Sequence, residues 1–250
     1  NYIKTMNIDD IKIEFNSKGL VIINNFLNFD EINYLKKFAD KEYDENNKNN
    51  FFLAGENFEN KFIDELNIIN KVQNLFDNLS SKLKIKNHSK DIYKVLRVVD
   101  GKMSKKEAHR YHFDAHLFTV LIPIHIPDNS NYKNGDLVLS PNFRELSKSI
   151  ITNLLQKVIY QNFIFKKIIN IKYFKDFFNF KQIKLKVGNL YLFNGYTSLH
   201  GNLEINSIDK RATLLLHCND VFKDSKIIQL NRKFRIKKEQ KNIKKNQKLS

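Results

Sequence analysis

The segment Tyr111–His116 combines metal-binding residue types at a spacing that suits a β-strand. Its sequence, YHFDAH, places His112 and Asp114 two positions apart. Side chains two apart on a strand point to the same face, so both can reach one ion. Two imidazoles and one carboxylate on one face of an octahedral ion form the facial triad of non-haem iron(II), which leaves three positions open. The pair alone is weak support, because it can arise by chance in a chain with seven histidines.

The second half of the chain supplies partners for this pair. The segment Gly195–His200 ends in a histidine, and a polar connection up to Lys210 follows it. The next apolar run begins with Arg211 and Thr213, whose spacing puts both on one face of a strand. A guanidinium is a planar fork that matches a carboxylate, and a hydroxyl adds a donor. We therefore expect His200 to complete the metal site, with a carboxylate bound beside it; the alternative for Arg211 is an exposed strand position.

An HxD pair that is followed by a distant histidine and then by an arginine resembles the pattern of the 2-oxoglutarate/iron(II)-dependent dioxygenase superfamily. The flanking residues VLRV at 95–98 and GDLVLSP at 135–141 also fit its pattern. The match covers roughly residues 93–218, with a similar strand and helix at 20–38. It looks closer to the phytanoyl-CoA hydroxylase-like and prolyl hydroxylase-like branches. Where the phytanoyl branch tends to have a Pro-Gly-Ser-His-like segment, this chain has SPNFR at 140–144, which argues against an acyl-CoA substrate.

The resemblance implies a double-stranded β-helix, or jelly roll, with Fe(II) as the metal, 2-oxoglutarate as cosubstrate and O₂ as oxidant. The implied metal ligands are His112, Asp114 and His200. The implied 2-oxoglutarate contacts are Arg211, Thr213 and Thr119. Halogenases of the family have a small residue in place of the carboxylate ligand. Asp114 therefore favours hydroxylation, or desaturation by the same route, with decarboxylation of 2-oxoglutarate to succinate and CO₂.

Other polar residues near the motif have competing interpretations. Arg97 and Arg110 are candidates for binding an acidic substrate, with plain surface roles as the alternative. His116 lies on the same alternating face as the motif, but its use as a ligand would shift the triad by two residues; we expect it to border the substrate cavity or to pack. His125 and His217 lie within apolar strands, which favours structural roles for both.

The elements that must position these residues follow from the apolar pattern. Asp30 is a plausible N-cap for a helix through Phe38, and 57–81 carries a second amphipathic pattern. The predicted strands are Leu20–Ile23, Tyr93–Val99, His112–Ile126, Asp136–Leu139, Ile183–Val187, Leu190–Asn194 and Arg211–Asn219. Helices first and many short strands later predict a mainly β fold with flanking helices, a sandwich or barrel with helices packed outside one sheet.

We divide the chain into a jelly-roll oxygenase domain, 1–222, and a basic C-terminal tail, 223–250. Within the domain, helices occupy about 1–90 and the catalytic core about 91–222. The apolar and aromatic stretch at about 146–180 interrupts the strands; we expect it to be helical and to pack on the sheet, with a lid or a dimer face as alternatives. The tail is expected to fray or to extend as a loose helix.

The composition and charge of the sequence limit the partners and the cellular location that we expect. The net charge is +16, of which the tail carries +9; a solvated surface with compositional bias is one interpretation, and an anionic partner or substrate is the other. Nucleic-acid binding ranks low, because Phe234 alone is no stacking platform. A single cysteine, Cys218, excludes an internal disulfide and favours the cytoplasm. No signal peptide or membrane span is expected; the first residue is Asn1, which leaves open whether a segment was removed.

Three hypotheses follow. The leading one is a dioxygenase that oxidises a small, acidic metabolite. The second is a protein or peptide hydroxylase that uses 146–180 and the tail as a docking surface. The third is a non-catalytic jelly-roll binding protein with a basic tail. No pattern in the sequence indicates an oligomeric state.

Overall fold

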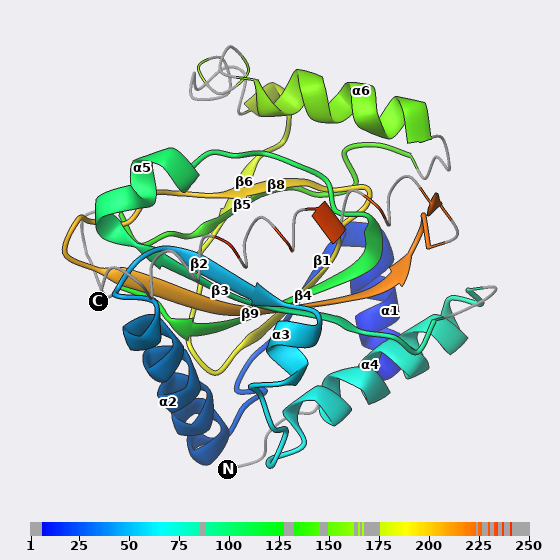
Figure 1. Ribbon diagram of the computed structural model, residues 1–250. Coiled ribbons are helices and arrows are strands. Elements are labelled where there is room, and N and C mark those ends of the chain that lie inside the picture. The colour runs from blue at the N-terminus through cyan, green and yellow to red at the C-terminus, as the bar shows by residue number, and fades with distance from the viewer. Residues whose placement is uncertain are drawn as a thin grey trace.

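The computed structural model describes residues 7–85, 89–127, 133–145, 150–162 and 176–223, with isolated positions at 165, 167 and in the tail. Two antiparallel sheets face each other, and helices cover the outer face of the larger one (Figure 1). The predicted frayed or helical tail lies almost wholly outside the described residues, as do 146–149 and most of 163–175. Among the described helices, none is long and apolar enough to cross a membrane.

The larger sheet brings together strands from both halves of the chain. Its order is β1 (Leu20–Ile23), β7 (Leu190–Asn194), β4 (His116–His125), β9 (Lys210–Asp220), β3 (Tyr93–Asp100) and β2 (Phe51–Ala54). The smaller sheet has the order β6 (Lys181–Ile183), β5 (Leu137–Ser140) and β8 (Leu199–Asn202). Because β4 lies between β7 and β9, the strand that follows the HxD motif contacts both strands that flank the later histidine–arginine segment.

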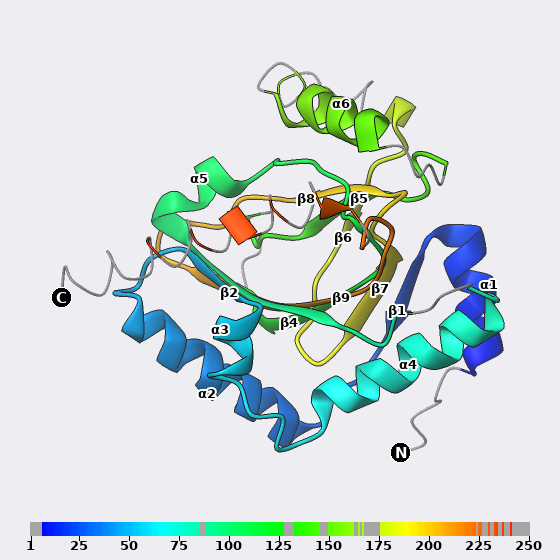
Figure 2. The same cartoon turned by 45° about the vertical axis from the view of Figure 1, so that its right-hand side comes forward.

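The helices are α1 (Ile8–Lys18), α2 (Phe29–Glu45), α3 (Glu56–Glu59), α4 (Ile68–Lys82), a 3₁₀ turn η1 (Gly101–Met103), α5 (Ser104–Glu107) and α6 (Ile150–Gln161). The first four lie against one face of the larger sheet, and α6 lies on the far side of the smaller one (Figure 2). The main hydrophobic core fills the space between the first four helices and the sheet.

The alternation of side chains along β9 separates this core from the space between the two sheets. Ala212, Leu214, Leu216 and Cys218 belong to the core under the helices. The intervening side chains therefore point to the opposite face, toward the smaller sheet. Leu121, Tyr191 and Phe193 on the neighbouring strands form a second apolar cluster on that opposite face. This cluster also contains Leu137 and Leu139 of the smaller sheet, so it packs the space between the two sheets beside the polar side chains of β9.

Four local predictions were wrong in detail. The strand predicted at Ile183–Val187 ends at Ile183, because β6 covers Lys181–Ile183. Helix α2 is capped by Asn28 and not by Asp30, because Asn28 and Glu31 form a reciprocal capping box. The second amphipathic pattern forms two helices, α3 and α4, because the Asp64 carboxylate accepts the N–H groups that begin α4. Strand β4 begins only at His116, so the HxD pair lies in the segment before it, where His112 forms an isolated antiparallel bridge.

Within the 146–180 stretch, the described residues Ile150–Gln161 form helix α6. Tyr160 of α6 packs edge-on against Phe113 at 5.7 Å between ring centroids, within an aromatic cluster that covers the smaller sheet. Arg144 lies between the rings of Phe113 and Tyr196, at 3.9 and 4.1 Å from their centroids. The stretch therefore covers the segment that carries the HxD pair, and its role as a lid or dimer face stays a prediction.

Candidate metal centre

His112, Asp114 and His200 converge between the two sheets. Their ligand atoms lie within 4.8 Å of one another. The His112 Nε2 atom is 3.7 Å from Asp114 Oδ1, and the His200 Nε2 atom is 3.5 Å from Asp114 Oδ2. The backbone explains the convergence: His112 and His200 exchange two N–H···O bonds of 2.9 and 3.0 Å, and Asp114 N–H donates to the Gly195 carbonyl at 2.8 Å.

Both histidine rings are oriented by backbone carbonyls. The Nδ1 atom of His112 lies 2.9 Å from the Arg110 carbonyl, and that of His200 lies 3.0 Å from the Ser198 carbonyl. Because a carbonyl only accepts, each Nδ1 must carry the proton. Each Nε2 is then left with a lone pair that faces Asp114. This outer-shell arrangement is how proteins usually fix a metal-binding imidazole.

The charges of the three groups suit a divalent cation. Desolvation by the surrounding protein lowers the pKa of His112, and the neighbouring His200 lowers it further, although 40% of the His112 side chain stays exposed. Burial alone would raise the pKa of Asp114, but His200, His217 and His112 together hold that pKa below its usual range. Near neutral pH the cluster therefore offers a neutral imidazole and a carboxylate anion, which are donors that iron(II) accepts.

Two further side chains contact Asp114. The Thr119 hydroxyl donates to Asp114 Oδ2 at 2.6 Å, and His217 Nδ1 lies 3.1 Å from that hydroxyl and 3.6 Å from Oδ2. The sequence predicted a structural role for His217 and did not place it beside Asp114. A signal was present, because His217 shares the alternation of Arg211 and Thr213 on β9 and so lies on the cavity face.

Arg211 and Thr213 lie on the cavity face of β9, as predicted, and are 4% and 2% exposed. The Arg211 Nη1 atom donates to the Gly135 carbonyl at 2.8 Å, and Nη2 donates to Asn202 Oδ1 at 3.3 Å. Its Nε atom is buried and has no acceptor among the described residues. Burial, together with the positive charge of Arg97, lowers the pKa of Arg211 to about 9, so it stays charged at neutral pH. A buried cation with an unused donor fits the carboxylate of 2-oxoglutarate.

Of the predicted substrate residues, Arg97 lies beside this arginine, whereas His116 pairs with the opposite end of β9. Arg97 is paired in register with Thr213, forms an ion pair with Glu107 and lines a small cavity together with Arg211. Arg110 is more exposed and lies 3.3 Å from Glu107. His116 is outside the triad, and its ring stacks on His217 at 5.2 Å between centroids. No ligand contact tests these three assignments, and they stay predictions.

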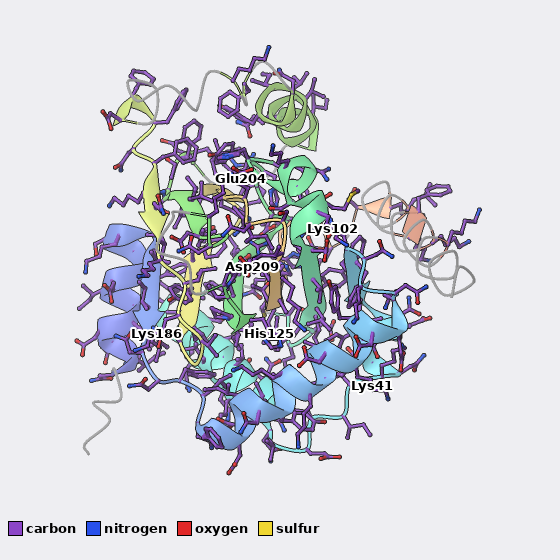
Figure 3. The ribbon with its side chains drawn as sticks, turned by 90° about the vertical axis from the view of Figure 1, so that its left-hand side faces the viewer. Lys41, Lys102, His125, Lys186, Glu204 and Asp209 are labelled. Carbon is purple, nitrogen blue, oxygen red and sulfur yellow. The ribbon has the colours of Figure 1, made fainter. Side chains whose placement is uncertain are left out.

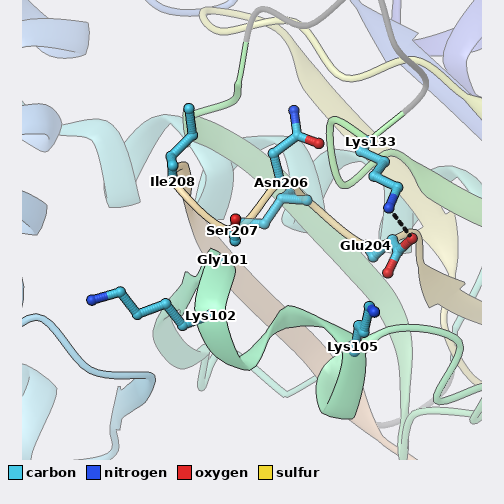
Figure 4. A pocket seen from close by; sticks show the side chains of 9 residues that line it. Gly101, Lys102, Lys105, Lys133, Glu204, Asn206, Ser207 and Ile208 are labelled. Atoms are coloured by element: carbon cyan, nitrogen blue, oxygen red, sulfur yellow. Dashed lines mark ion pairs between the residues drawn. The ribbon is translucent and has the colours of Figure 1, made fainter.

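A larger cavity of about 530 Å³ opens beside the first and shares Ile205 with it. Lys102, Lys105 and Lys133 line it, and Lys133 forms an ion pair with Glu204 at 2.9 Å (Figure 4). In Figure 3, Lys102 and Glu204 lie on the same side of the molecule, above α2. Neither Lys102 nor Lys105 has an ion pair with a described residue. The mouth of this cavity is therefore positively charged.

Comparison with known proteins supports the fold. No protein-family model matches the chain, and no curated protein matches it in sequence. Among solved structures, a prolyl-4-hydroxylase from Pseudomonas putida is similar over 85% of this chain and 98% of its own, with a TM-score of 0.54 and 8% identity. The α-ketoglutarate-dependent epimerase SnoN from nogalamycin biosynthesis is similar over 85% of this chain and 83% of its own, with a TM-score of 0.58 and 11% identity.

A third similar structure is EvdO2 from Micromonospora carbonacea var. aurantiaca in complex with 2-oxoglutarate. It covers 87% of this chain and 93% of its own, with a TM-score of 0.57 and 11% identity. The predicted double-stranded β-helix of 2-oxoglutarate/iron(II) oxygenases is thus confirmed as the fold. The predicted resemblance is also confirmed by the His-Asp-His triad, whose three ligand atoms this fold brings together.

Proposed function

We propose that the protein is an Fe(II)- and 2-oxoglutarate-dependent dioxygenase that hydroxylates, or desaturates, a small anionic metabolite. The observation that carries the proposal is the triad itself. Its two imidazoles have their Nδ1 atoms bonded to carbonyls, so that both Nε2 atoms face the Asp114 carboxylate. When bound, iron(II), 2-oxoglutarate and O₂ supply the oxidation of a substrate C–H bond, with release of succinate and CO₂.

The residues of the chain prepare the cavity for this chemistry. His112, Asp114 and His200 would hold the metal on one face and leave the other face for cosubstrate and O₂. Arg211 would bind the distal carboxylate of 2-oxoglutarate, with its Nε as the remaining donor and Thr213 as a second contact. The apolar side chains Leu121, Tyr191 and Phe193 would exclude water from one side of the cavity.

The anionic character of the substrate is supported by the lysine-lined cavity. Lys102 and Lys105 face a mouth that adjoins the cavity of Arg97 and Arg211. Exposed ionic contacts contribute about 0.2–1 kcal/mol each, and they weaken as salt rises. Replacing both lysines with glutamine should therefore raise the KM for an anionic substrate several-fold and leave kcat unchanged. Lys41→Gln is the matched control, because Lys41 is exposed on α2, away from this mouth.

The test is Fe(II)-dependent succinate release across a panel of carboxylated and phosphorylated metabolites. The proposal expects at least one of them to stimulate release, and expects His112→Ala to abolish it. If removing residues 223–250 abolished the sole measurable activity while His112→Ala left it intact, the protein would instead be a binding protein that acts through its basic tail.

A protein or peptide substrate is the second candidate. The observation that favours it is an apolar stripe on α6: Ile151, Leu155, Val158 and Ile159 are 53–73% exposed. Such a stripe suits docking of a polypeptide beside the cavity. Succinate release that is stimulated by polypeptides alone, and is lost when Leu155 and Val158 are both replaced by serine, would select this candidate over the metabolite.

A further inference from the structure

We propose that Thr119 and His217 are positioning residues that hold the Asp114 carboxylate, so that one oxygen faces the metal and the other is anchored in the protein. This inference rests on the iron site of the proposed function. It assigns to Thr119 a task other than contact with 2-oxoglutarate, and it gives His217 a place in the site.

The donors and acceptors fix the direction of each bond. A carboxylate only accepts, so the 2.6 Å contact between Thr119 Oγ1 and Asp114 Oδ2 must contain the hydroxyl proton. The hydroxyl oxygen can then only accept from His217 Nδ1, at 3.1 Å. The His217 ring must therefore carry a proton on Nδ1. The result is a directed chain from imidazole to hydroxyl to carboxylate, and it ends on Oδ2.

The chain of hydrogen bonds ends on only one of the two carboxylate oxygens. Oδ1 accepts no hydrogen bond from the described residues and lies 3.7 Å from His112 Nε2. Oδ2 lies 3.5 Å from His200 Nε2, close enough to swing toward the same ion. Its bond to Thr119 opposes that swing. We infer that Asp114 binds the metal through Oδ1 alone, which preserves the open positions for cosubstrate and O₂.

Two features make the arrangement rigid. Thr119 on β4 and His217 on β9 are direct partners in the register of adjacent strands, and both are buried. Gly195 lies close to both groups, since a Cβ added there would lie 2.2 Å from Thr119 Oγ1 and 2.6 Å from Asp114 Oδ2. The carboxylate and hydroxyl are thus enclosed between one backbone segment and the sheet.

The experiment measures Co(II) binding to the full chain without cosubstrate, by titration followed through the visible absorption of the ion. Thr119→Val keeps the shape and removes the hydroxyl, whereas Thr119→Ser keeps the hydroxyl. Loss of an outer-shell partner typically costs about 10–100-fold in metal affinity. We expect Thr119→Val to weaken Co(II) binding by that factor and to change the absorption spectrum, because the freed Oδ2 alters the coordination. Thr119→Ser should restore both.

His217→Phe keeps an aromatic ring and removes the N–H donor, so it tests the His217 end of the hydrogen-bond chain. It should weaken Co(II) binding when Thr119 is present and add little to Thr119→Val, because both changes break one chain. This variant decides the matter alone if Thr119→Val fails to fold. Thermal unfolding of the metal-free variants separates loss of metal affinity from loss of stability.

The outcomes separate this inference from the proposed function. If the natural chain binds Co(II) and Thr119→Val binds it with the same affinity and spectrum, the positioning role is wrong and the iron site stands. If Thr119→Ser is as weak as Thr119→Val, the hydroxyl is not the cause and the positioning role is again wrong. If the natural chain itself binds no Co(II), the proposed function falls together with the inference.

Discussion

Gly195→Ala is the perturbation whose effect the structure specifies most directly. The residue contacts Asp114 twice: its carbonyl accepts the Asp114 N–H at 2.8 Å, and its Cα faces the carboxylate. The Gly195 backbone has no positive φ that would itself require glycine. The requirement for glycine is therefore one of space alone.

The magnitude follows from three distances. The added Cβ would lie 2.2 Å from Thr119 Oγ1, 2.6 Å from Asp114 Oδ2 and 3.0 Å from Asp114 Cβ. Ordinary contacts with a carbon atom are about 3.5–4 Å, so the hydroxyl and the carboxylate must each move by about 1 Å. A displacement of about 1 Å in a catalytic constellation can cost about 100-fold in rate, and overpacking costs about 1–3 kcal/mol in stability. We expect both effects in Gly195→Ala.

The assay compares Co(II) affinity, Fe(II)-dependent succinate release and thermal unfolding in Gly195→Ala and Gly201→Ala. Gly201 follows His200 directly, but the nearest atoms to its added Cβ belong to Tyr111, at 3.1 Å, and to the Arg110 backbone, at 3.5 Å, and not to Asp114. Gly201→Ala should therefore keep metal affinity near that of the natural chain. Equal metal affinity and activity in the natural chain and Gly195→Ala would refute the reasoning that the carboxylate is confined by this glycine.

Three further predictions test other parts of the structure. Arg211→Met should weaken 2-oxoglutarate binding by about 10–100-fold in a calorimetric titration, since a charged hydrogen bond contributes about 1.5–3 kcal/mol, while Co(II) affinity stays unchanged. Burial lowers the pKa of His125 despite its contact with Asp40, so the folded state binds fewer protons there than the unfolded state. The stability that the folded state gains from a neutral His125 is present above about pH 6.5 and declines as the pH falls below that value. His125→Gln should therefore flatten this decline when thermal unfolding is measured as a function of pH. Phe118→Ala should lower the free energy of unfolding in urea by about 3–5 kcal/mol, because Phe118 is 1% exposed and stacks on Phe76.

The metal ligands could be predicted from the sequence because their signal is a set of residue types in a fixed order. His112, Asp114, His200 and Arg211 carry the pattern in their identities and need no exact strand boundary. The premise that the HxD pair lies on a regular strand was wrong, yet His112 and Asp114 do converge with His200. An extended segment that is hydrogen-bonded to His200 and Gly195 brings the two side chains to one place as a strand would.

The environment of Asp114 could not be predicted in the same way. Whether Thr119 meets His217 depends on the register between β4 and β9, which the turns and the packing set and no local pattern encodes. His217 therefore looked like any polar residue in an apolar strand. The Asn28 cap was missed for a similar reason, since Asn28 and Asp30 are both good caps and the reciprocal bond with Glu31 decides between them.

The 146–180 stretch shows what apolar content can and cannot predict. Its aromatic residues predicted packing, and Tyr160 does join the cluster beneath α6. The apolar content gave no sign that other side chains of the same helix, such as Leu155 and Val158, would face outward. Their outward direction follows from the rotation of α6 about its axis, which is fixed by the contacts of Gln156 with Arg144 and of Tyr160 with Phe113.

The central claim is tested most directly by a crystal structure with Mn(II), as a redox-inert substitute for Fe(II), and 2-oxoglutarate bound. The account predicts one ion held by His112 Nε2, Asp114 Oδ1 and His200 Nε2, with the distal carboxylate of 2-oxoglutarate against Arg211. An ion held by other residues, or 2-oxoglutarate bound away from Arg211, would contradict it.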